Sequence, residues 1–377
     1  MKLTVLQENL KKAVTLTSHF VSPKAQLPIL GNILLKTNKS KLILSATNLE
    51  TSIITSIGAK VESEGEITIN GKTLNDLVLN LSSGSIELEA EKEQLKITSG
   101  KFKSNILGSN SSDFPTLPVQ SKKNKFTLNR EEFINSLSKV LFAVSTDETR
   151  PILTGVLFVF ARKSLKFVAT DGFRLSEVKL KSEIDIEDLN IIIPKAVLYE
   201  LTKIVDEETI EVSFDKENNQ VIFGIGETIL SSRIIEGEFP DYEKIIPATS
   251  VATINIDKNE FEKAIKLASV FARDSGKIIK LKINKQSLSL QDNTELVITA
   301  ESSSAGNQEM SLEVRSEDKI ESEINIMFNY SFIEDVLKVI TDDEVKIIIA
   351  SDNKASKFLD SKSPNFLHII MPIKKQD

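Results

Sequence analysis

The chain has 377 residues, of which 40% are hydrophobic and 27% charged, a balance typical of a globular protein with two or three domains. It contains no cysteine, which excludes disulfides and thiolate metal sites and fits a reducing, cytoplasmic setting. Its net charge of -7 argues against nucleic-acid binding by overall charge, unless positive charge gathers on one surface. The start of the chain turns polar by Gln7, so we expect no signal peptide. No window approaches the ~18 apolar residues of a membrane span, so we expect no membrane contact.

Three segments begin alike, with a short strand, a polar step and an amphipathic helix. The strands are Leu3-Thr4-Val5, Phe126-Thr127-Leu128 and Ile254-Asn255-Ile256. Each helix is predicted from apolar residues that recur at helical spacing on one side. These residues are Leu10, Ala13, Val14 and Thr17, then Phe133, Leu137, Val140 and Val144, then Phe261, Ala264, Ile265 and Ala268.

A second helix is predicted after an apolar strand in each third of the chain. Its apolar positions are Leu74, Leu77, Val78 and Leu81, then Val197, Leu198, Leu201 and Val205, then Phe332, Val336, Leu337 and Ile340. Both helices recur in the same order and at similar spacing, which indicates an internal repeat. Alternating apolar and polar runs between the helices predict antiparallel strands with one solvated face.

The sequence therefore predicts an α+β fold of three repeated modules, each with two helices packed on antiparallel sheets. Phe114-Pro115 and Phe239-Pro240 each close a module and lead into a polar or proline-marked stretch. We place the modules at residues 1–120, 121–248 and 249–377.

A search for catalytic chemistry finds no candidate. The two histidines, His19 and His368, lie in different thirds, which disfavours a histidine metal site, and His19 is interpreted as a helix-end residue. Gly71-Lys72-Thr73 resembles the end of a phosphate-binding loop, but the glycine that such a loop requires is replaced by Glu66. We interpret the triplet as a strand-to-helix turn in which glycine relieves backbone strain. No catalytic residue, cofactor or metal is expected.

The predicted helices carry lysine and arginine on their polar faces or flanks although the whole chain is acidic. These residues are Lys11, Lys12, Arg130, Lys139, Lys195, Lys203, Lys263, Lys266, Lys277 and Lys338. A basic face repeated by module indicates a surface for a polyanion. The pattern leaves open a repeat protein that binds without encircling its partner and, more weakly, an enzyme with an unrecognised site.

Four motifs resemble the β subunit of bacterial DNA polymerase III, the sliding-clamp family, over the full length. They are Leu27-Pro28-Ile29-Leu30-Gly31-Asn32, Ala169-Thr170-Asp171-Gly172-Phe173-Arg174-Leu175-Ser176, Gly237-Glu238-Phe239-Pro240-Asp241-Tyr242 and Ile369-Ile370-Met371-Pro372-Ile373. The resemblance implies a non-catalytic processivity factor, with each chain forming half of a closed homodimeric ring. Such a ring encircles duplex DNA, slides through sequence-independent phosphate contacts and tethers the polymerase III catalytic subunit, the clamp loader and other clamp-motif proteins.

The resemblance also implies a peptide-binding pocket between modules two and three. Its positions here are Leu153, Thr170, Gly172, Phe173, Arg174, Leu175, Pro240, Ile245, Phe332, Ile369, Met371 and Ile373. Gly172 would permit the turn that presents Phe173. Phe173 stands where a histidine is common in the family, and the chain continues through Lys374-Lys375-Gln376-Asp377 beyond the usual end.

Further positions follow from the same resemblance. For DNA contact they are Lys24, Lys72, Arg150, Lys195 and Lys277, and for the dimer interface they are Ile106, Val270 and Phe271. Ser104 stands where the family typically has a large apolar residue, which departs from the usual interface.

Overall fold

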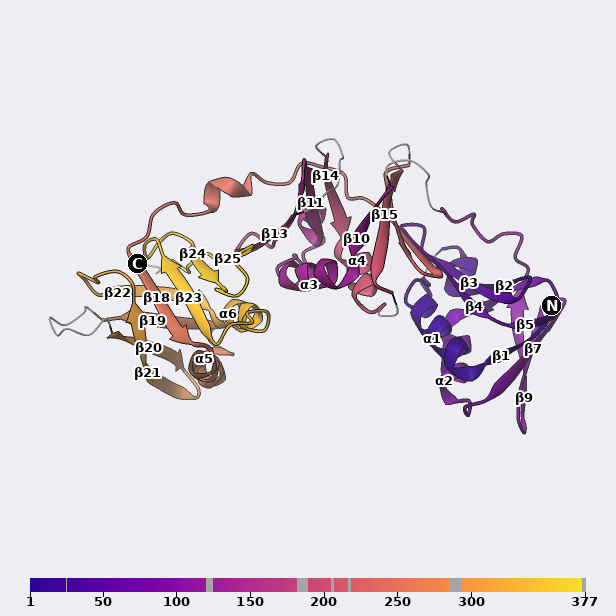
Figure 1. The fold of residues 1–377 in the computed structure, drawn as a ribbon. Helices are drawn as coiled ribbons and strands as arrows, with labels where there is room; N and C mark the ends of the chain where they lie inside the picture. The colour runs from indigo at the N-terminus through magenta and orange to yellow at the C-terminus, as the bar shows by residue number, and fades with distance from the viewer. Residues whose placement is uncertain are drawn as a thin grey trace. The chain divides into compact units, whose positions relative to one another are not determined.

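The computed structural model describes residues 1–24, 26–119, 125–181, 189–204, 207–215, 218–284 and 293–374, and the chain folds into two compact units (Figure 1). Unit 1 holds Met1–Ile134 and Ala196–Ile234, and unit 2 holds Asn135–Lys195 and Ile235–Asp377. Each unit is built on one antiparallel sheet. Within the described ranges, no helix is both long and apolar enough to cross a membrane.

Unit 1 contains a 13-stranded sheet in the order β10-β15-β16-β17-β4-β3-β2-β6-β9-β8-β7-β1-β5. Its strands are β1 (Lys2–Leu6), β2 (Asn32–Asn38), β3 (Lys41–Thr47), β4 (Thr51–Gly58), β5 (Lys60–Ser63), β6 (Glu66–Asn70), β7 (Ser85–Glu91), β8 (Gln94–Ser99), β9 (Phe102–Ser109), β10 (Lys125–Asn129), β15 (Thr209–Asp215), β16 (Gln220–Ile225) and β17 (Thr228–Arg233). Helices α1 (Gln7–Ser18) and α2 (Gly71–Asn80) contact each other, and α1 packs on β3 and β4 (Figure 1).

Unit 2 contains a 12-stranded sheet in the order β14-β11-β12-β13-β25-β24-β23-β18-β21-β20-β19-β22. Its strands are β11 (Gly155–Ala161), β12 (Ser164–Thr170), β13 (Arg174–Lys181), β14 (Leu189–Pro194), β18 (Ala252–Asp257), β19 (Ile278–Ile283), β20 (Asn293–Ser302), β21 (Gly306–Ser316), β22 (Ile324–Asn329), β23 (Glu344–Ile349), β24 (Ser356–Leu359) and β25 (Phe366–Ile370). Helices α5 (Lys258–Ala272) and α6 (Tyr330–Leu337) lie side by side, and α5 packs on β20 and β21 (Figure 1).

The helices of the central third are α3 (Arg130–Leu141) and α4 (Lys195–Thr202), and short 3-10 turns occur at η1 (Pro28–Gly31), η2 (Pro151–Thr154) and η3 (Tyr242–Ile245). Several helices begin directly after a strand, where a polar side chain caps the first turn. Asn70 accepts a hydrogen bond from the Thr73 backbone N–H, and Asp257 accepts one from Glu260. Such caps satisfy amide groups that a helix start leaves without partners, which explains the sharp strand-to-helix change.

The expected repeat is visible in the way the thirds of the chain join. Strand β17 of the central third pairs with β4 of the first third, with Leu230 opposite Ile53. Strand β25 of the last third pairs with β13 of the central third, with Ile369 opposite Leu175. The last strand of one third thus extends the sheet of the third before it at both junctions.

The predicted α+β class with antiparallel sheets is confirmed. Three helices end earlier than predicted. Leu81, predicted as part of the second helix, is the cap residue after α2. Val144 and Ile340 are buried but lie after the ends of α3 and α6. Val205 lies outside the described residues. The expected reason for Gly71 was wrong: it does not have a positive φ, and an added Cβ would approach Val21 Cγ1 to 2.9 Å. Close packing therefore explains this glycine. The module boundaries stay predictions.

Candidate functional site

The turn between β12 and β13 is held by its own side chains. Thr170 Oγ1 donates to the Arg174 carbonyl at 2.6 Å and accepts from the Gly172 N–H at 3.1 Å. Asp171 Oδ1 accepts from the N–H groups of Phe173 and Arg174 at 2.9 and 3.0 Å. Gly172 has φ +92°, a backbone conformation that residues with a Cβ rarely adopt. The turn therefore presents Phe173 outward, with 59% of its surface exposed.

This turn docks on the C-terminal strand of the chain. Arg174 and Leu175 lie opposite Ile370 and Ile369 in the β13–β25 ladder. Beyond the ladder, the Met371 N–H donates to the Phe173 carbonyl at 2.8 Å. The backbone that carries Phe173 is therefore fixed from both sides, by Asp171 and by Met371.

An apolar cluster lies beneath the turn. Its buried members are Leu157, Val168, Leu175, Ile192, Tyr242, Ala355 and Ile369. Partly buried side chains pack against it, namely Ile152, Val159, Ile235, Phe239, Ile246, Leu367 and Met371. The half-buried rim offers apolar side chains beside fixed backbone groups, the combination typical of peptide and ligand sites.

Arg174 connects the turn to the neighbouring helices. Its Nε donates to Asp171 Oδ2 at 3.0 Å, its Nη1 to Asp335 Oδ2 at 2.8 Å and its Nη2 to the Phe142 carbonyl at 2.7 Å. The guanidinium lies over the rings of Phe142 and Phe332, 5.4 and 4.5 Å from their centroids. Burial opposes ionisation of Asp335, but hydrogen bonds from Arg174 and Lys338 outweigh it and lower the pKa of this carboxyl. Arg174 thus donates from all three nitrogens of its guanidinium group.

The cations named for DNA contact differ in their surroundings. Lys24, Lys72 and Lys277 are exposed. Arg150 is paired with Asp147, with 2.9 Å between Nε and Oδ2, and its Nη1 lies against Gly172, where an added Cβ would meet it at 3.2 Å. Arg150 therefore borders the turn of Phe173.

Lys195 is partly buried, and its pKa is lowered first by burial and then by the charge of Arg174. Lys195 is therefore not a freely solvated cation. Lys139 has similar surroundings: burial lowers its pKa, and its Nζ donates to Ser363 Oγ at 2.6 Å. Both lysines are packed into unit 2.

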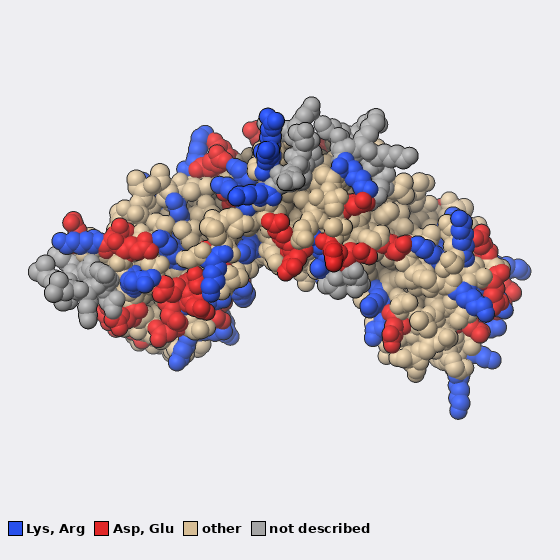
Figure 2. Space-filling model, in the orientation of Figure 1, with Lys and Arg blue, Asp and Glu red and all other residues tan. Residues whose placement is uncertain are grey.

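Ion pairs also reduce the positive charge of the helix faces that were expected to be basic. Lys203 pairs with Glu200, Lys266 with Glu262 and Lys338 with Asp335. On the face drawn in Figure 2, lysine and arginine are interspersed with aspartate and glutamate. On this face the positive charge is thus divided among separate cations with carboxylates between them.

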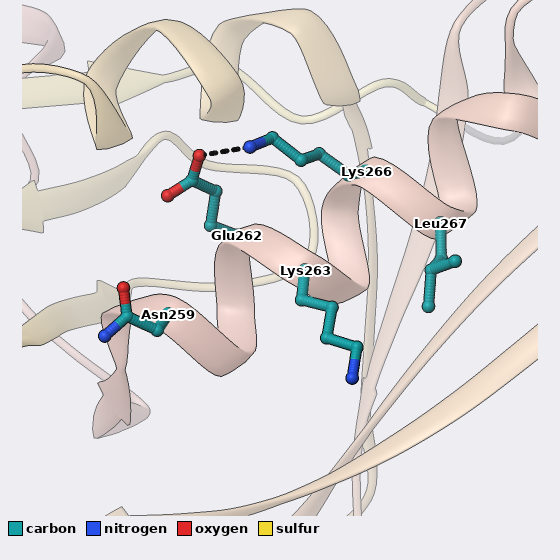
Figure 3. A pocket seen from close by; sticks show the side chains of 5 residues that line it. All are labelled: Asn259, Glu262, Lys263, Lys266 and Leu267. Atoms are coloured by element: carbon teal, nitrogen blue, oxygen red, sulfur yellow. Dashed lines mark hydrogen bonds and ion pairs between the residues drawn. The ribbon is translucent and has the colours of Figure 1, made fainter.

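The exposed side of α5 carries a hollow lined by five residues of that helix. They are Asn259, Glu262, Lys263, Lys266 and Leu267 (Figure 3). Glu262 and Lys266 bond to each other at 2.6 Å, whereas Lys263 projects separately (Figure 3). The hollow is thus a mixed polar surface in which Glu262 and Lys266 are already paired with each other. Among the described residues, no group of histidine, aspartate or glutamate has a geometry that could hold a metal ion.

Comparison with known proteins bears on the identity of the chain. Profiles of the N-terminal, central and C-terminal domains of the DNA polymerase III beta subunit match residues 1–118, 127–241 and 243–374. The beta sliding clamp of Staphylococcus aureus is 30% identical over 386 residues, which cover 99% of each chain. The chain belongs to the beta sliding clamp family. The beta sliding clamp of Staphylococcus epidermidis is 29% identical over 384 residues, again covering 99% of each chain.

Solved sliding clamps share the fold over the whole chain. The crystal structure of the DNA polymerase sliding clamp from Bacillus subtilis has a TM-score of 0.91 and 26% identity, and covers 100% of both chains. The DNA polymerase III beta subunit of Thermotoga maritima has a TM-score of 0.90 and 25% identity, with the same coverage. The resemblance seen in the four motifs therefore extends to the complete three-domain sliding-clamp fold.

The structure brings most of the predicted pocket residues of this clamp together. Contacts or strand pairing join Thr170, Gly172, Phe173, Arg174, Leu175, Phe332, Ile369 and Met371. Leu153 is buried in η2, and its neighbour Ile152 packs on the cluster. Pro240 and Ile245 are exposed, while the adjacent Phe239 and Ile246 reach the cluster. The Ile373 N–H donates to the Met327 carbonyl at 2.8 Å, outside the turn.

Sequence reasoning missed several residues of this region. Ala355 and Tyr242 belong to the buried cluster, and Asp335 and Phe142 hold Arg174. Burial and the nearby Glu177 raise the pKa of Tyr242, so its hydroxyl stays protonated. A signal for Asp335 was present, because the sixth residue of the second helix is acidic in every third of the chain.

The residues named for the dimer interface lie on strand β9 and near the end of helix α5. Ile106 on β9 is buried, but its neighbour Leu107 is 76% exposed. Val270 is 57% exposed near the end of α5, and Phe271 is partly buried. Among the described residues, β9 pairs with β8 along its length but with β6 only at Gly108 and Ser109. Similarly, β21 pairs with β20 along its length but with β18 only at its last two residues.

Proposed function

We propose that this protein is the processivity clamp of a replicative DNA polymerase, working as a homodimeric ring of six modules. The modules are residues 1–120, 121–248 and 249–377 of each chain. The ring encircles duplex DNA, slides by sequence-independent phosphate contacts and works in the cytoplasm without catalytic chemistry or a cofactor. Retention then depends on topology, because weak phosphate contacts alone would release DNA as salt rises.

The observation that carries this proposal is that successive modules join in the same way, by pairing of the last strand of one with a strand of the module before it. β17 joins β4 and β25 joins β13 within the chain, and each pairing extends an earlier sheet. The equivalent last strand of the first module is β9, and the equivalent acceptor strand of the last module is β21. Both present open edges over most of their length in the described part of the chain. An open strand edge is a template for pairing, so a second copy can complete the third junction.

The charges of the two edges favour this pairing. Lys101 and Lys103 flank the exposed Phe102 at the start of β9, and Glu309 is exposed on β21. Opposite charges on facing strands stabilise a pair, whereas two copies of the same edge would repel each other. The exposed Leu107 supplies an apolar side chain for the same contact. We call the proposed contact of β9 with the partner's β21 the seam.

We propose that Lys24, Lys72 and Lys277 contact the DNA backbone, since all three are exposed. Lysine reaches phosphates as a flexible point charge and does not read bases, which suits a sliding contact. Arg150 and Lys195 are kept as candidates, but their surroundings in unit 2 favour a supporting role beside the turn of Phe173.

We propose that the cluster beneath the turn of Phe173 receives short peptides of the polymerase III catalytic subunit, the clamp loader and other clamp-motif proteins. Exposed Phe173 and half-buried Met371 form its apolar rim, and Arg174 fixes the turn between them. Leu175 and Ile369 are fully buried and serve as the floor.

The mass in solution tests the ring. Light scattering at micromolar concentration should give twice the 41.9 kDa chain mass. Leu107→Asp should lower the mass toward that of one chain, because it places a charge in the apolar seam. Leu6→Asp is the matched control, since Leu6 is also an exposed leucine of unit 1 but lies on β1. A wild-type monomer would refute the ring, and an equally dimeric Leu107→Asp variant would refute this seam.

A further inference from the structure

The second helix of each module carries a carboxylate at the same position. Helices α2, α4 and α6 begin at Gly71, Lys195 and Tyr330, each directly after a strand. Their sixth residues are Asp76, Glu200 and Asp335. Two of these three carboxylates have a defined role in the chain.

Glu200 anchors the junction between modules one and two. His19, the cap residue after α1, lies with Nδ1 2.7 Å from Glu200 Oε2. Lys203, three residues further along, bonds to the other oxygen, Oε1, at 2.8 Å. The carboxylate thus receives one cation from the residue that follows its own helix and one ring nitrogen from the preceding module.

Asp335 anchors the junction between modules two and three in the same way. Arg174 of the preceding module donates to its Oδ2, and Lys338, the cap residue after the same helix, donates to its Oδ1 at 2.9 Å. Phe142, which corresponds to His19 in the repeat, accepts a hydrogen bond from the same Arg174. At both junctions, a side chain of one module bonds to the sixth residue of the second helix of the next, directly from the end of α1 in His19 and through Arg174, which also holds the residue after α3, in the second case.

Asp76 has the equivalent position in module one, the first module of the sequence. Its side chain is exposed and has no ion-pair partner in the described ranges. The residue that corresponds to Lys203 and Lys338 is Leu79, which is 41% exposed. Module one therefore carries an exposed apolar residue at the position where the other two modules carry the supporting lysine.

The end of α5 supplies the complementary group. Val270 corresponds in the repeat to His19 and Phe142, and α5 continues past this point to Ala272. Arg273 caps the helix, is exposed, and likewise has no side-chain partner among the described residues. It lies one helical turn beyond Val270, on the same side of the helix.

We propose that Asp76 of one copy forms an ion pair with the partner's Arg273, with Leu79 packed on the partner's Val270, as the helix-side lock of the seam. The inference rests on the proposed dimer and adds a contact on the helix side to the strand pairing of β9 and β21. The ligand of this surface is a second copy of the same chain. Burying Leu79 and Val270 beside the pair excludes water and strengthens its attraction.

Charge reversal tests the lock in the full-length protein. Asp76→Arg alone and Arg273→Asp alone each put like charges at both seams of a homodimer. Each variant should raise the dimer dissociation constant roughly tenfold to a hundredfold, the range expected when partly exposed pairs become repulsive. Analytical ultracentrifugation measures this constant, and circular dichroism checks that each variant is folded.

A mixture of the two variants gives the decisive result. In the mixed dimer, one seam joins the new arginine at 76 to the new aspartate at 273, and the other keeps the natural pair. We therefore expect the mixture to form heterodimers with near wild-type affinity, counted by native mass spectrometry. Exposed residues outside β9, β21, α2 and α5 provide matched controls, Asp113→Arg and Arg162→Asp, which should leave every constant unchanged.

The outcomes separate the lock from the ring. If the wild type dimerises but both reversals leave its affinity unchanged, the lock is overturned and the proposed ring stands. If both reversals weaken the dimer but the mixture recovers no affinity, the two residues do not face each other and the lock is also overturned. A wild-type monomer would contradict the proposed function itself.

Discussion

Replacing Arg174 with methionine should release the turn of Phe173 from the rest of unit 2. The change removes both ion pairs, to Asp171 and Asp335, and leaves the Phe142 carbonyl without its donor. Removing one member of a buried ion pair costs about 3–5 kcal/mol, and these groups are mostly buried, so we expect about 3 kcal/mol. Arg174→Lys keeps the charge but loses the fork, and should cost about half as much.

Hydrogen exchange measures this local effect better than global unfolding, because a chain of several modules need not unfold in one step. A loss of about 3 kcal/mol corresponds to roughly hundredfold faster exchange. The increase should appear in β25 and at the Met371 amide, which bonds to the Phe173 carbonyl. β7 in unit 1 is the internal control and should not change. Unchanged protection of β25 in Arg174→Met would refute this account of Arg174.

Three further predictions concern the peptide pocket, the buried His368 and the DNA contacts. Phe173→Ala with Met371→Ala should abolish binding of a clamp-motif peptide in calorimetry while the dimer mass stays the same, and unchanged affinity would refute the placement. Burial, with a smaller contribution from the charge of Arg174, lowers the pKa of His368 well below 6.5, so unfolded chains bind this proton more tightly. Stability should therefore fall as pH drops below 6.5, with a slope that His368→Leu reduces in urea titrations; equal slopes would contradict it. Lys72→Gln should lower the salt dependence of DNA association by about one phosphate contact, whereas Lys195→Gln should change it less. Equal changes would contradict the distinction.

The fold was largely predictable because its signals are local. Helix spacing around Leu10, Phe133 and Phe261 and the order of the thirds were enough for the repeat and the α+β class. Helix ends were less predictable, because Val144 and Ile340 continue the apolar pattern after the helix has ended and are buried in their unit. The buried face of a helix and the buried segment that follows it both require apolar residues, so periodicity alone cannot show where the helix ends.

The candidate site was predictable only in the part that is formed by residues adjacent in the sequence. The segment from Thr170 to Leu175 carries its own hydrogen bonds, and its residues could be named from the motif. Asp335 and Phe142 reach Arg174 from distant parts of the chain, so their contribution depends on tertiary packing that no local pattern encodes. The repeat offered a partial route, because equivalent positions on α2, α4 and α6 could be compared before the structure was known.

Retention on circular DNA tests the central claim most directly. The clamp would be loaded onto a nicked plasmid circle and washed at about 1 M salt, where the Debye length is about 3 Å and phosphate contacts are strongly screened. A topological ring should stay on the circle through this wash and leave once a restriction enzyme cuts the DNA. Equal loss from the circular and the linear form would contradict encirclement and leave an open repeat protein that binds DNA by charge alone.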